Sequence, residues 1–251
     1  MKKIFIIGNW KCNPTSLSEA KNLFLSINKK IKKKRKIETV ICPPFVYLYP
    51  LAQLNRGHKI VLGAQDTFFE EKGAFTGQVS AVMLKDLGCK YVIVGHSEKR
   101  AHGDNDEIIN KKIHILLKEN LTPILCIGET KEEREKKQTF EKIKYQIQEG
   151  LRKVAKKYLH KVIIAYEPIW AIGTNRPCPP ESVLTMSIFI RKTFSTLFGL
   201  KKTDKIAILY GGSVNADNAK RYVEEARVNG LLIGSSSLKA EEFLKIIFSF
   251  Y

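Results

Sequence analysis

The chain has 251 residues, of which 44% are hydrophobic and 27% charged, a composition that excludes a disordered or fibrous protein and allows a large buried core. Its 43 Lys and Arg outnumber its 25 Asp and Glu, so the formal charge is +18, and a basic nucleic-acid-binding protein is one alternative to an enzyme. The basic residues are scattered and not interleaved with an aromatic recognition motif, so we interpret them as solvated helix faces and expect no specific nucleic acid as a partner.

Eight short apolar runs recur along the chain, and each is followed by a polar turn. They are near-continuously hydrophobic, as strands buried on both faces are, whereas half-exposed strands alternate. The runs cover residues 4–7, 39–42, 60–62, 91–94, 123–127, 162–166, 206–209 and 231–233. We therefore predict eight parallel strands.

Longer stretches with helical spacing of apolar residues separate several of these runs. In the first stretch Leu23, Phe24, Ile27 and Ile31 share one helix face. The predicted helices cover residues 18–34, 106–119, 131–158 and 181–198. Pro180 fits the first turn of the last helix, where its missing N–H is no loss.

The alternation of strands and helices indicates parallel βαβ units with right-handed crossovers. With no linker or composition break in about 250 residues, we predict an α/β fold: a single-domain (β/α)8 TIM barrel over residues 1–251. An open doubly wound sheet is the alternative. It would usually carry a G-x-G-x-x-G turn after the first strand, and here that turn reads Gly8-Asn9-Trp10-Lys11.

The five cysteines are odd in number and no two have C-x-x-C spacing, so we expect neither a disulfide framework nor a zinc site. The apolar run 4–7 is too short for a signal peptide, and no segment has the apolar length of a membrane span. We therefore expect a cytoplasmic protein with no membrane partner. Cys12 and Cys178 fall in predicted loops and are the expected positions of any redox sensitivity.

Polar and glycine residues follow the ends of most predicted strands. In a barrel these ends share one rim, where catalytic groups are found. The last two turns predict a phosphate site, because glycine lets main-chain N–H groups approach an anion. The residues at the rim are Asn9, Lys11, Gln65, His96, Ser97, Glu98, Glu129, Glu167, Gly211-Gly212-Ser213 and Gly234-Ser235-Ser236.

One lysine, one histidine and one glutamate remain once the phosphate turns are set aside. This set has no nucleophile–base pair and no metal cluster, and it suits proton abstraction next to a carbonyl group. Glu167 would be the base, His96 would polarise the carbonyl oxygen, and Lys11 would offset the charge that develops on that oxygen. The spacing of these residues leaves the substrate open.

Several motifs resemble the triosephosphate isomerase family, in the family's order and over nearly the whole chain. The stretch from Ala165 to Thr174 is similar to that family's catalytic base followed by its lid, and it is the most specific of them. The others are Asn9-Trp10-Lys11, Gly73-Ala74-Phe75-Thr76-Gly77-Gln78, Gly95-His96-Ser97-Glu98, Cys126-Ile127-Gly128-Glu129 and Tyr210-Gly211-Gly212-Ser213-Val214.

The resemblance implies an isomerase of glycolysis and gluconeogenesis that interconverts dihydroxyacetone phosphate and D-glyceraldehyde 3-phosphate through an enediolate, without cofactor or metal. Glu167 and His96 would be catalytic, with His96 a neutral hydrogen-bond donor, an arrangement for which this family is the standard example. Asn9 and Lys11 would hold the substrate, and Glu98 would lie near Lys11 and His96. The phosphate would be bound by main-chain N–H groups, those of Gly173, Ser213, Gly234 and Ser235.

The resemblance also implies two features outside the reaction itself. A lid from Pro168 to Cys178 would shield the enediolate from water, and the loop from Asp66 to Val79 would form a homodimer. The chain departs from the family at Ser235, where a second glycine is usual, and at Asn175-Arg176-Pro177 in the lid. Another barrel aldose–ketose isomerase, acting on a larger phosphorylated sugar, is the alternative function.

Overall fold

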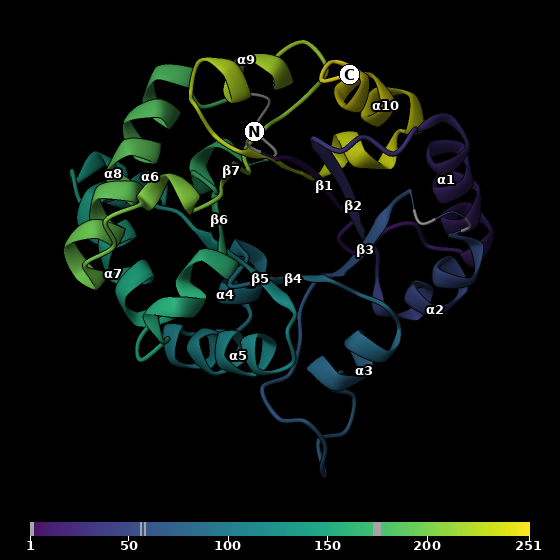
Figure 1. Ribbon diagram of the computed structural model, residues 1–251, viewed down its shortest axis with the longest axis horizontal. Helices are drawn as coiled ribbons and strands as arrows, with labels where there is room; N and C mark the ends of the chain where they lie inside the picture. The colour runs from purple at the N-terminus through teal and green to yellow at the C-terminus, as the bar shows by residue number, and fades with distance from the viewer. Residues whose placement is uncertain (1–2, 56, 58, 173–176) are drawn as a thin grey trace.

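The computed structural model describes residues 3–55, 57, 59–172 and 177–251, and its strands form a closed parallel barrel in the order β1 to β8 (Figure 1). The strands are β1 Ile4–Asn9, β2 Ile37–Cys42, β3 Val61–Ala64, β4 Tyr91–Val94, β5 Thr122–Ile127, β6 Ile163–Tyr166, β7 Ile208–Tyr210 and β8 Gly230–Ile233. The predicted TIM barrel is confirmed, and the open sheet is excluded because β1 also pairs with β8.

Helices surround this ring of strands. The α-helices are α1 Leu17–Lys30, α2 Phe45–Leu54, α3 Ala81–Asp86, α4 Ser97–Ala101, α5 Asp106–Lys118, α6 Lys131–Glu135, α7 Thr139–Gly150, α8 Pro180–Phe198, α9 Ala219–Glu224 and α10 Ala240–Phe248. Short 3-10 helices are η2 Lys156–Lys161, η3 Ile169–Ala171, η4 Thr203–Lys205 and η5 Ser235–Leu238. Local sequence sets several boundaries: Pro180 occupies the first turn of α8, and Gly199 ends that helix in the left-handed conformation.

The predicted helix over residues 131–158 is wrong, because the structure breaks it into α6, α7 and η2. Thr130 and Glu133 form a reciprocal capping box that starts α6, and Lys137 then takes a positive φ of 58°. Lys153 takes a φ of 61° after α7. A right-handed helix cannot pass through a left-handed residue, so these two lysines end α6 and α7.

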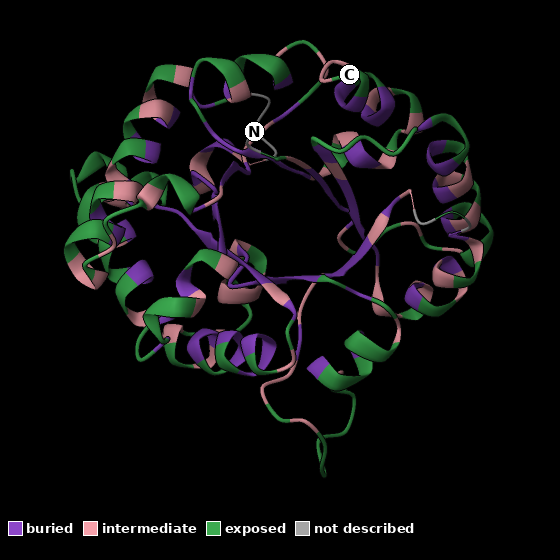
Figure 2. Ribbon diagram, viewed as in Figure 1, coloured by how far each residue is buried: buried purple, intermediate pink, exposed green. Residues whose placement is uncertain are grey.

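The core has two layers, one on each side of the ring of strands, and Figure 2 shows that most of this ring is buried. Side chains inside the barrel include Ile7, Val40, Ile93, Ile124 and Leu209. The larger layer fills the space between strands and helices. Strands buried on both faces explain why the sequence shows continuous apolar runs instead of alternation.

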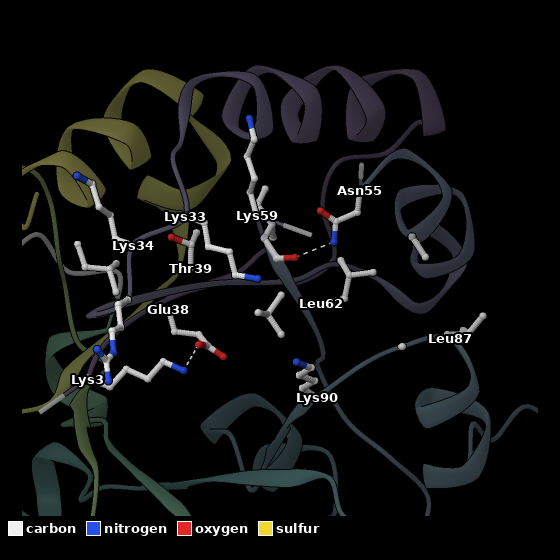
Figure 3. A pocket seen from close by; sticks show the side chains of 16 residues that line it. Lys3, Lys33, Lys34, Glu38, Thr39, Asn55, Lys59, Leu62, Leu87 and Lys90 are labelled. Carbon is white, nitrogen blue, oxygen red and sulfur yellow. Dashed lines mark hydrogen bonds and ion pairs between the residues drawn. The ribbon is translucent and has the colours of Figure 1, made fainter. Parts of the chain in front are cut away.

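The N-terminal ends of the strands form the mouth of the barrel opposite to the strand ends named above. The turns that lead into β1, β2, β3 and β4 bring lysines together there around a hollow (Figure 3). At the C-terminal ends lie the residues for which we predict chemistry. The two mouths therefore differ in what they can bind.

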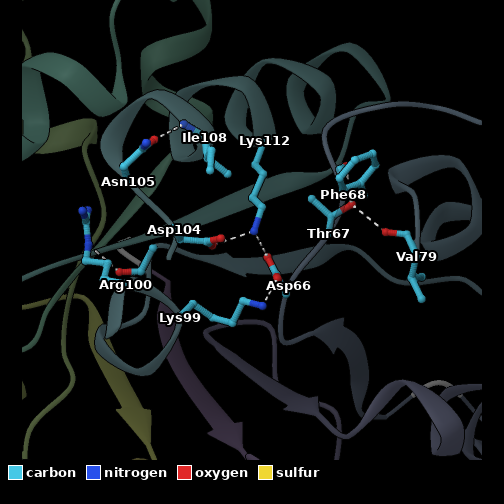
Figure 4. Close-up of polar contacts among 11 residues, drawn as sticks. Asp66, Thr67, Phe68, Val79, Lys99, Arg100, Asp104, Asn105, Ile108 and Lys112 are labelled. Carbon is cyan, nitrogen blue, oxygen red and sulfur yellow. Dashed lines mark hydrogen bonds and ion pairs between the residues drawn. The ribbon is translucent and has the colours of Figure 1, made fainter. Parts of the chain in front are cut away.

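The loop between β3 and α3 projects from the barrel wall, at the bottom of Figure 1. Its neck is closed by a hydrogen bond from the Phe68 N–H to the Val79 carbonyl at 2.8 Å. Figure 4 shows Lys112, which is almost fully buried, reaching Asp66 at 2.7 Å and Asp104 at 2.6 Å. These ion pairs fix the base of the loop to α5 and to the turn before it.

Candidate active site

The sequence-predicted residues that the structure describes meet in one cavity at the C-terminal mouth of the barrel. The cavity measures about 300 Å³, at the lower end of the range for small-molecule sites. Gly173 lies outside the described residues. The predicted site residues that line the cavity are Asn9, Lys11, His96, Glu167, Ser213, Gly234 and Ser235.

Lys11 is held in place by its neighbours through an unusual backbone conformation. Its φ is 54°, in the left-handed region that non-glycine residues rarely adopt. Its N–H donates to Asn9 Oδ1 at 3.0 Å, and its carbonyl accepts from Gln65 Nε2 at 2.9 Å. The Lys11 ammonium donates to Glu98 Oε1 at 2.6 Å. Asn9 and Gln65 together stabilise the strained backbone that directs Lys11 into the cavity.

His96 is buried, and its hydrogen bonds identify which ring nitrogen carries the proton. The residue caps α4, and its Nδ1 accepts from the Glu98 N–H at 3.2 Å. An acceptor nitrogen has no proton, so the neutral ring carries its proton on Nε2. Nε2 faces Glu167 Oε1 across 3.5 Å. His96 can therefore donate a hydrogen bond from Nε2 to a ligand in the cavity.

Glu167 follows β6 and is the buried carboxylate of the site, with 3% of its surface exposed. Its N–H donates to the Ile127 carbonyl at 2.8 Å, which fixes the start of the side chain at the barrel rim. Burial raises the pKa of Glu167, and His96 and Lys11 partly oppose this increase. A carboxylate with a raised pKa is a stronger base and is suited to proton abstraction.

Two glycines make room for Glu167. Any side chain at Gly128 would overlap the Glu167 carbonyl, so the turn after β5 can approach β6 only with glycine there. A Cβ at Gly211 would lie 2.7 Å from Glu167 Cγ and 3.1 Å from Oε1. The glycine after β7 thus contributes space for the base, a role that the sequence did not indicate.

The other end of the cavity is formed by the turns after β7 and β8, which are tied to each other. Ser236 Oγ donates to the Val214 carbonyl at 2.6 Å, and Ser237 Oγ donates to the Gly234 carbonyl at 2.6 Å. The first bond holds the turn with Ser213 beside the turn with Gly234 and Ser235, and the second closes the turn after β8 on itself. Main-chain N–H groups at two adjoining turns are a favourable site for a phosphate group.

The beginning of the predicted lid is anchored by Glu129, which is fully buried. Its carboxylate accepts from Trp170 Nε1 at 2.9 Å and from the Tyr166 hydroxyl at 3.1 Å. The Arg134 guanidinium lies 4.6 Å from the centre of the Trp170 ring and 3.3 Å from Glu129. Trp170 is therefore fixed by a hydrogen bond at its edge and a cation at its face.

The end of the predicted lid is held by two stacked tyrosines. The Cys178 N–H donates to the Tyr210 hydroxyl at 3.0 Å, and the Tyr222 hydroxyl donates to the Cys178 carbonyl at 2.7 Å. Cys178 is buried, and burial raises the pKa of its thiol to about 12. Cys178 does lie in a loop, as predicted, but its burial makes it a poor position for redox sensitivity, whereas Cys12 is exposed.

Sequence reasoning missed the roles of residues that act by supporting others: Gln65 bonds to Lys11, Gly211 makes room for Glu167, and Tyr210 and Tyr222 hold Cys178. The only signal for Gln65 was its place after β3. Within the described ranges, no group of three or more His, Cys, Asp and Glu side chains could hold a metal ion. In the same ranges no helix is long and apolar enough to cross a membrane.

Comparison with known proteins finds one family throughout. A family model described as "Triosephosphate isomerase" matches residues 4–250. The triosephosphate isomerase of Aquifex aeolicus (strain VF5) is 45% identical over 246 residues, with 98% of each chain covered. That of Alkaliphilus oremlandii (strain OhILAs) is 45% identical over 248 residues, and that of Endomicrobium trichonymphae is 41% identical over 248 residues. These alignments cover 98% of this chain and 99% and 98% of those relatives.

Proposed function

The chain belongs to the triosephosphate isomerase family and interconverts dihydroxyacetone phosphate and glyceraldehyde 3-phosphate, and we propose that Glu167 and His96 are its catalytic residues. The reaction is part of glycolysis and gluconeogenesis. The observation that carries the assignment is the approach of His96 Nε2 to Glu167 Oε1, 3.5 Å apart and both buried in a cavity that ends in two glycine-rich turns.

In this proposal the Glu167 carboxylate removes a proton from the carbon next to the substrate carbonyl and returns it to the neighbouring carbon. The neutral His96 donates a hydrogen bond from its Nε2–H group to the oxygen on which negative charge develops. Lys11 adds a positive charge near the same oxygen, and Asn9 keeps the Lys11 backbone in place. The raised pKa of Glu167 suits this role, because the carboxylate must accept a proton from one carbon and the resulting carboxylic acid must release it to the next.

The phosphate would be bound by main-chain N–H groups of Ser213, Gly234 and Ser235, with Gly173 of the lid as a further donor. The bond between the turns after β7 and β8, and the bond within the second turn, support a preorganised anion site. Ser235 keeps its N–H but adds a side chain that glycine lacks. The cavity of about 300 Å³ suits a three-carbon phosphate better than a larger sugar phosphate.

The variant Glu167→Gln tests the assignment of the base. The amide is nearly isosteric but cannot take up a proton, so kcat should fall by roughly 10²–10⁴ while the fold is retained. Glu224→Gln on the outer surface of α9 makes the same chemical change and should leave kcat unaltered. A Glu167→Gln enzyme with near-wild-type kcat would rule the assignment out. Turnover of only five- or six-carbon phosphates would instead favour the larger-sugar isomerase.

We further propose that the chain forms a homodimer through the loop of residues 66–79. Most of the loop from Glu70 to Gln78 is exposed, and Phe75 exposes 42% of its surface while packing on Phe68 at 4.6 Å. An exposed aromatic residue at the tip of a projecting loop is typical of a protein interface. Light scattering should give twice the chain mass, and Phe75→Ser should shift it towards the monomer. A wild-type monomer at micromolar concentration would contradict this proposal.

We also propose that residues 1–251 form a single domain and that the protein is cytoplasmic. Closure of the barrel between β1 and β8 supports the first, because the two ends of the chain share one sheet. The five cysteines are unpaired, which supports a reducing compartment. One cooperative unfolding transition and recovery in the cytosolic fraction are the expected results. Two separate transitions, or secretion, would contradict them.

A further inference from the structure

The mouth of the barrel opposite to the active site contains a cavity of about 390 Å³, which we call the basic cavity. The chain enters parallel strands at this end, so the turns before β1 to β4 converge there. These turns contribute all of the cationic side chains that line the cavity. They are Lys3, Lys33, Lys34, Arg35, Lys59 and Lys90.

The charge of the basic cavity is poorly balanced by the protein itself. Six cationic residues face a single carboxylate, Glu38. Glu38 is already engaged, because it forms an ion pair with Lys3 and accepts from the Tyr91 hydroxyl at 2.7 Å. Among the residues that the structure describes, no further ion pair joins a cation of this cavity to a carboxylate. The cavity thus keeps an excess of positive charge.

The positions of the lysines leave room between them. In Figure 3 Lys33 and Lys3 reach inward toward Glu38, whereas Lys59 points away, and its ammonium donates to the Asn28 carbonyl at 3.0 Å. The floor is apolar, with Ile60 and Leu62 among the lining residues. Cations above a low-dielectric floor produce a stronger field than cations in open water.

We propose that the basic cavity binds an oligophosphate anion, either inorganic tripolyphosphate or the phosphate chain of a nucleotide. Apart from Lys59, the cations come from three separate turns, those before β1, β2 and β4, so an extended anion with several charges can meet more of them than a single orthophosphate can. The volume lies within the range of small-molecule sites. The active site differs in kind, because its phosphate would be held by main-chain N–H groups, and the two sites do not depend on each other.

The first test is calorimetric titration of the full chain with sodium tripolyphosphate at about 50 mM salt. The active site is kept saturated with 2-phosphoglycolate, a small phosphorylated carboxylate, so that binding there is blocked. One tripolyphosphate per chain should still bind. Loss of all binding under this condition would overturn the proposal, because the anion would then occupy only the active site.

The second test uses two triple variants that remove the same charge. The first variant removes three cations from the basic cavity through Lys33→Gln, Arg35→Gln and Lys90→Gln. It should weaken tripolyphosphate binding roughly tenfold or more. The control carries Lys144→Gln, Lys192→Gln and Lys245→Gln on the exposed faces of α7, α8 and α10. It should weaken binding by less than about threefold. Equal losses in both variants would mean general attraction to a basic protein and would overturn the proposal.

Three further measurements separate the possible outcomes. Isomerase kcat should be unchanged in both triple variants, which shows that they are folded whether or not the cavity binds. The charge-preserving variant Lys33→Arg with Lys90→Arg should retain binding, and its failure to do so would argue against a charge-based site. Titration with ATP and with adenosine identifies the source: ATP binding without adenosine binding indicates a nucleotide phosphate chain, and tripolyphosphate binding alone indicates the inorganic anion.

Discussion

Gly211, which follows β7, lies against Glu167, so adding one methyl group there moves the base without touching it chemically. The Cβ of an alanine would lie 2.7 Å from Glu167 Cγ, whereas carbon atoms in contact prefer about 3.5 Å or more. The glutamate side chain must therefore shift by about 0.8 Å. Gly211 does not have a positive φ, so alanine adds a steric contact and no backbone strain.

A misplacement on the order of 1 Å costs about 100-fold in rate, or about 2.7 kcal/mol of transition-state stabilisation. We expect Gly211→Ala to lower kcat by about that factor and to change KM by less than about threefold, because the proposed phosphate donors Ser213, Gly234 and Ser235 are themselves unchanged. A coupled assay with glyceraldehyde 3-phosphate measures both. Gly150→Ala, the same change at the end of α7, should keep kcat. A Gly211→Ala enzyme with at least half of the wild-type kcat would refute the reasoning.

Three further predictions concern stability. Glu167→Gln should stabilise the protein at about pH 7.5, because burial raises the pKa of Glu167 and its ionisation therefore opposes folding. The gain in the free energy of unfolding, measured with urea, should shrink as the pH falls and vanish below about pH 4.5, where the folded and unfolded states both hold the proton. An equal gain at both pH values would contradict this prediction. Glu129→Gln should lower the free energy of unfolding in urea by about 1–2 kcal/mol, since a neutral amide accepts more weakly from Trp170 and Tyr166. An unchanged unfolding midpoint would argue against Glu129 as the anchor of Trp170. Lys112→Met should lower the free energy of unfolding by roughly 3 kcal/mol, because it removes the cation that Asp66 and Asp104 share. A loss below about 1 kcal/mol would show that solvent already screens these two carboxylates.

The strands could be predicted from the sequence because burial on both faces leaves a continuous apolar run. The run 91–94 coincides with β4, and the other seven differ from the observed strands by one or two residues at one or both ends. Several helices could not be predicted. In α2 the sequence FVYLYPLAQL is apolar on most sides and contains Pro50, so it has no helical periodicity to detect. In α6 and α7 the pattern continued across Lys137, whose left-handed backbone depends on local turn geometry.

At the site, the residues that line the cavity were predictable because strand ends of a parallel barrel share one rim. The residues that hold them were not. The bond from Gln65 to the Lys11 carbonyl joins positions 54 residues apart, and the bond from Tyr222 to Cys178 joins positions 44 residues apart. Nothing in the local sequence of either residue indicates its partner, because the contact arises only when the barrel closes. Supporting contacts of this kind are a property of the fold and not of a motif.

Glu129 connects the position of the base with that of the lid. The end of β5 and the turn after it accept three hydrogen bonds from the segment 167–171. The Ile127 carbonyl accepts from the Glu167 N–H at 2.8 Å, and the Glu129 carbonyl accepts from the Ile169 N–H at 3.0 Å. The Glu129 carboxylate accepts from Trp170 Nε1. The first two bonds join main chains, so they persist whatever the side chains do. The third is a side-chain contact that a shift of Trp170 would break. If this segment is the start of the lid that the family resemblance implies, movement of Trp170 costs a bond to a buried charge, while Glu167, the proposed base, stays bonded to β5.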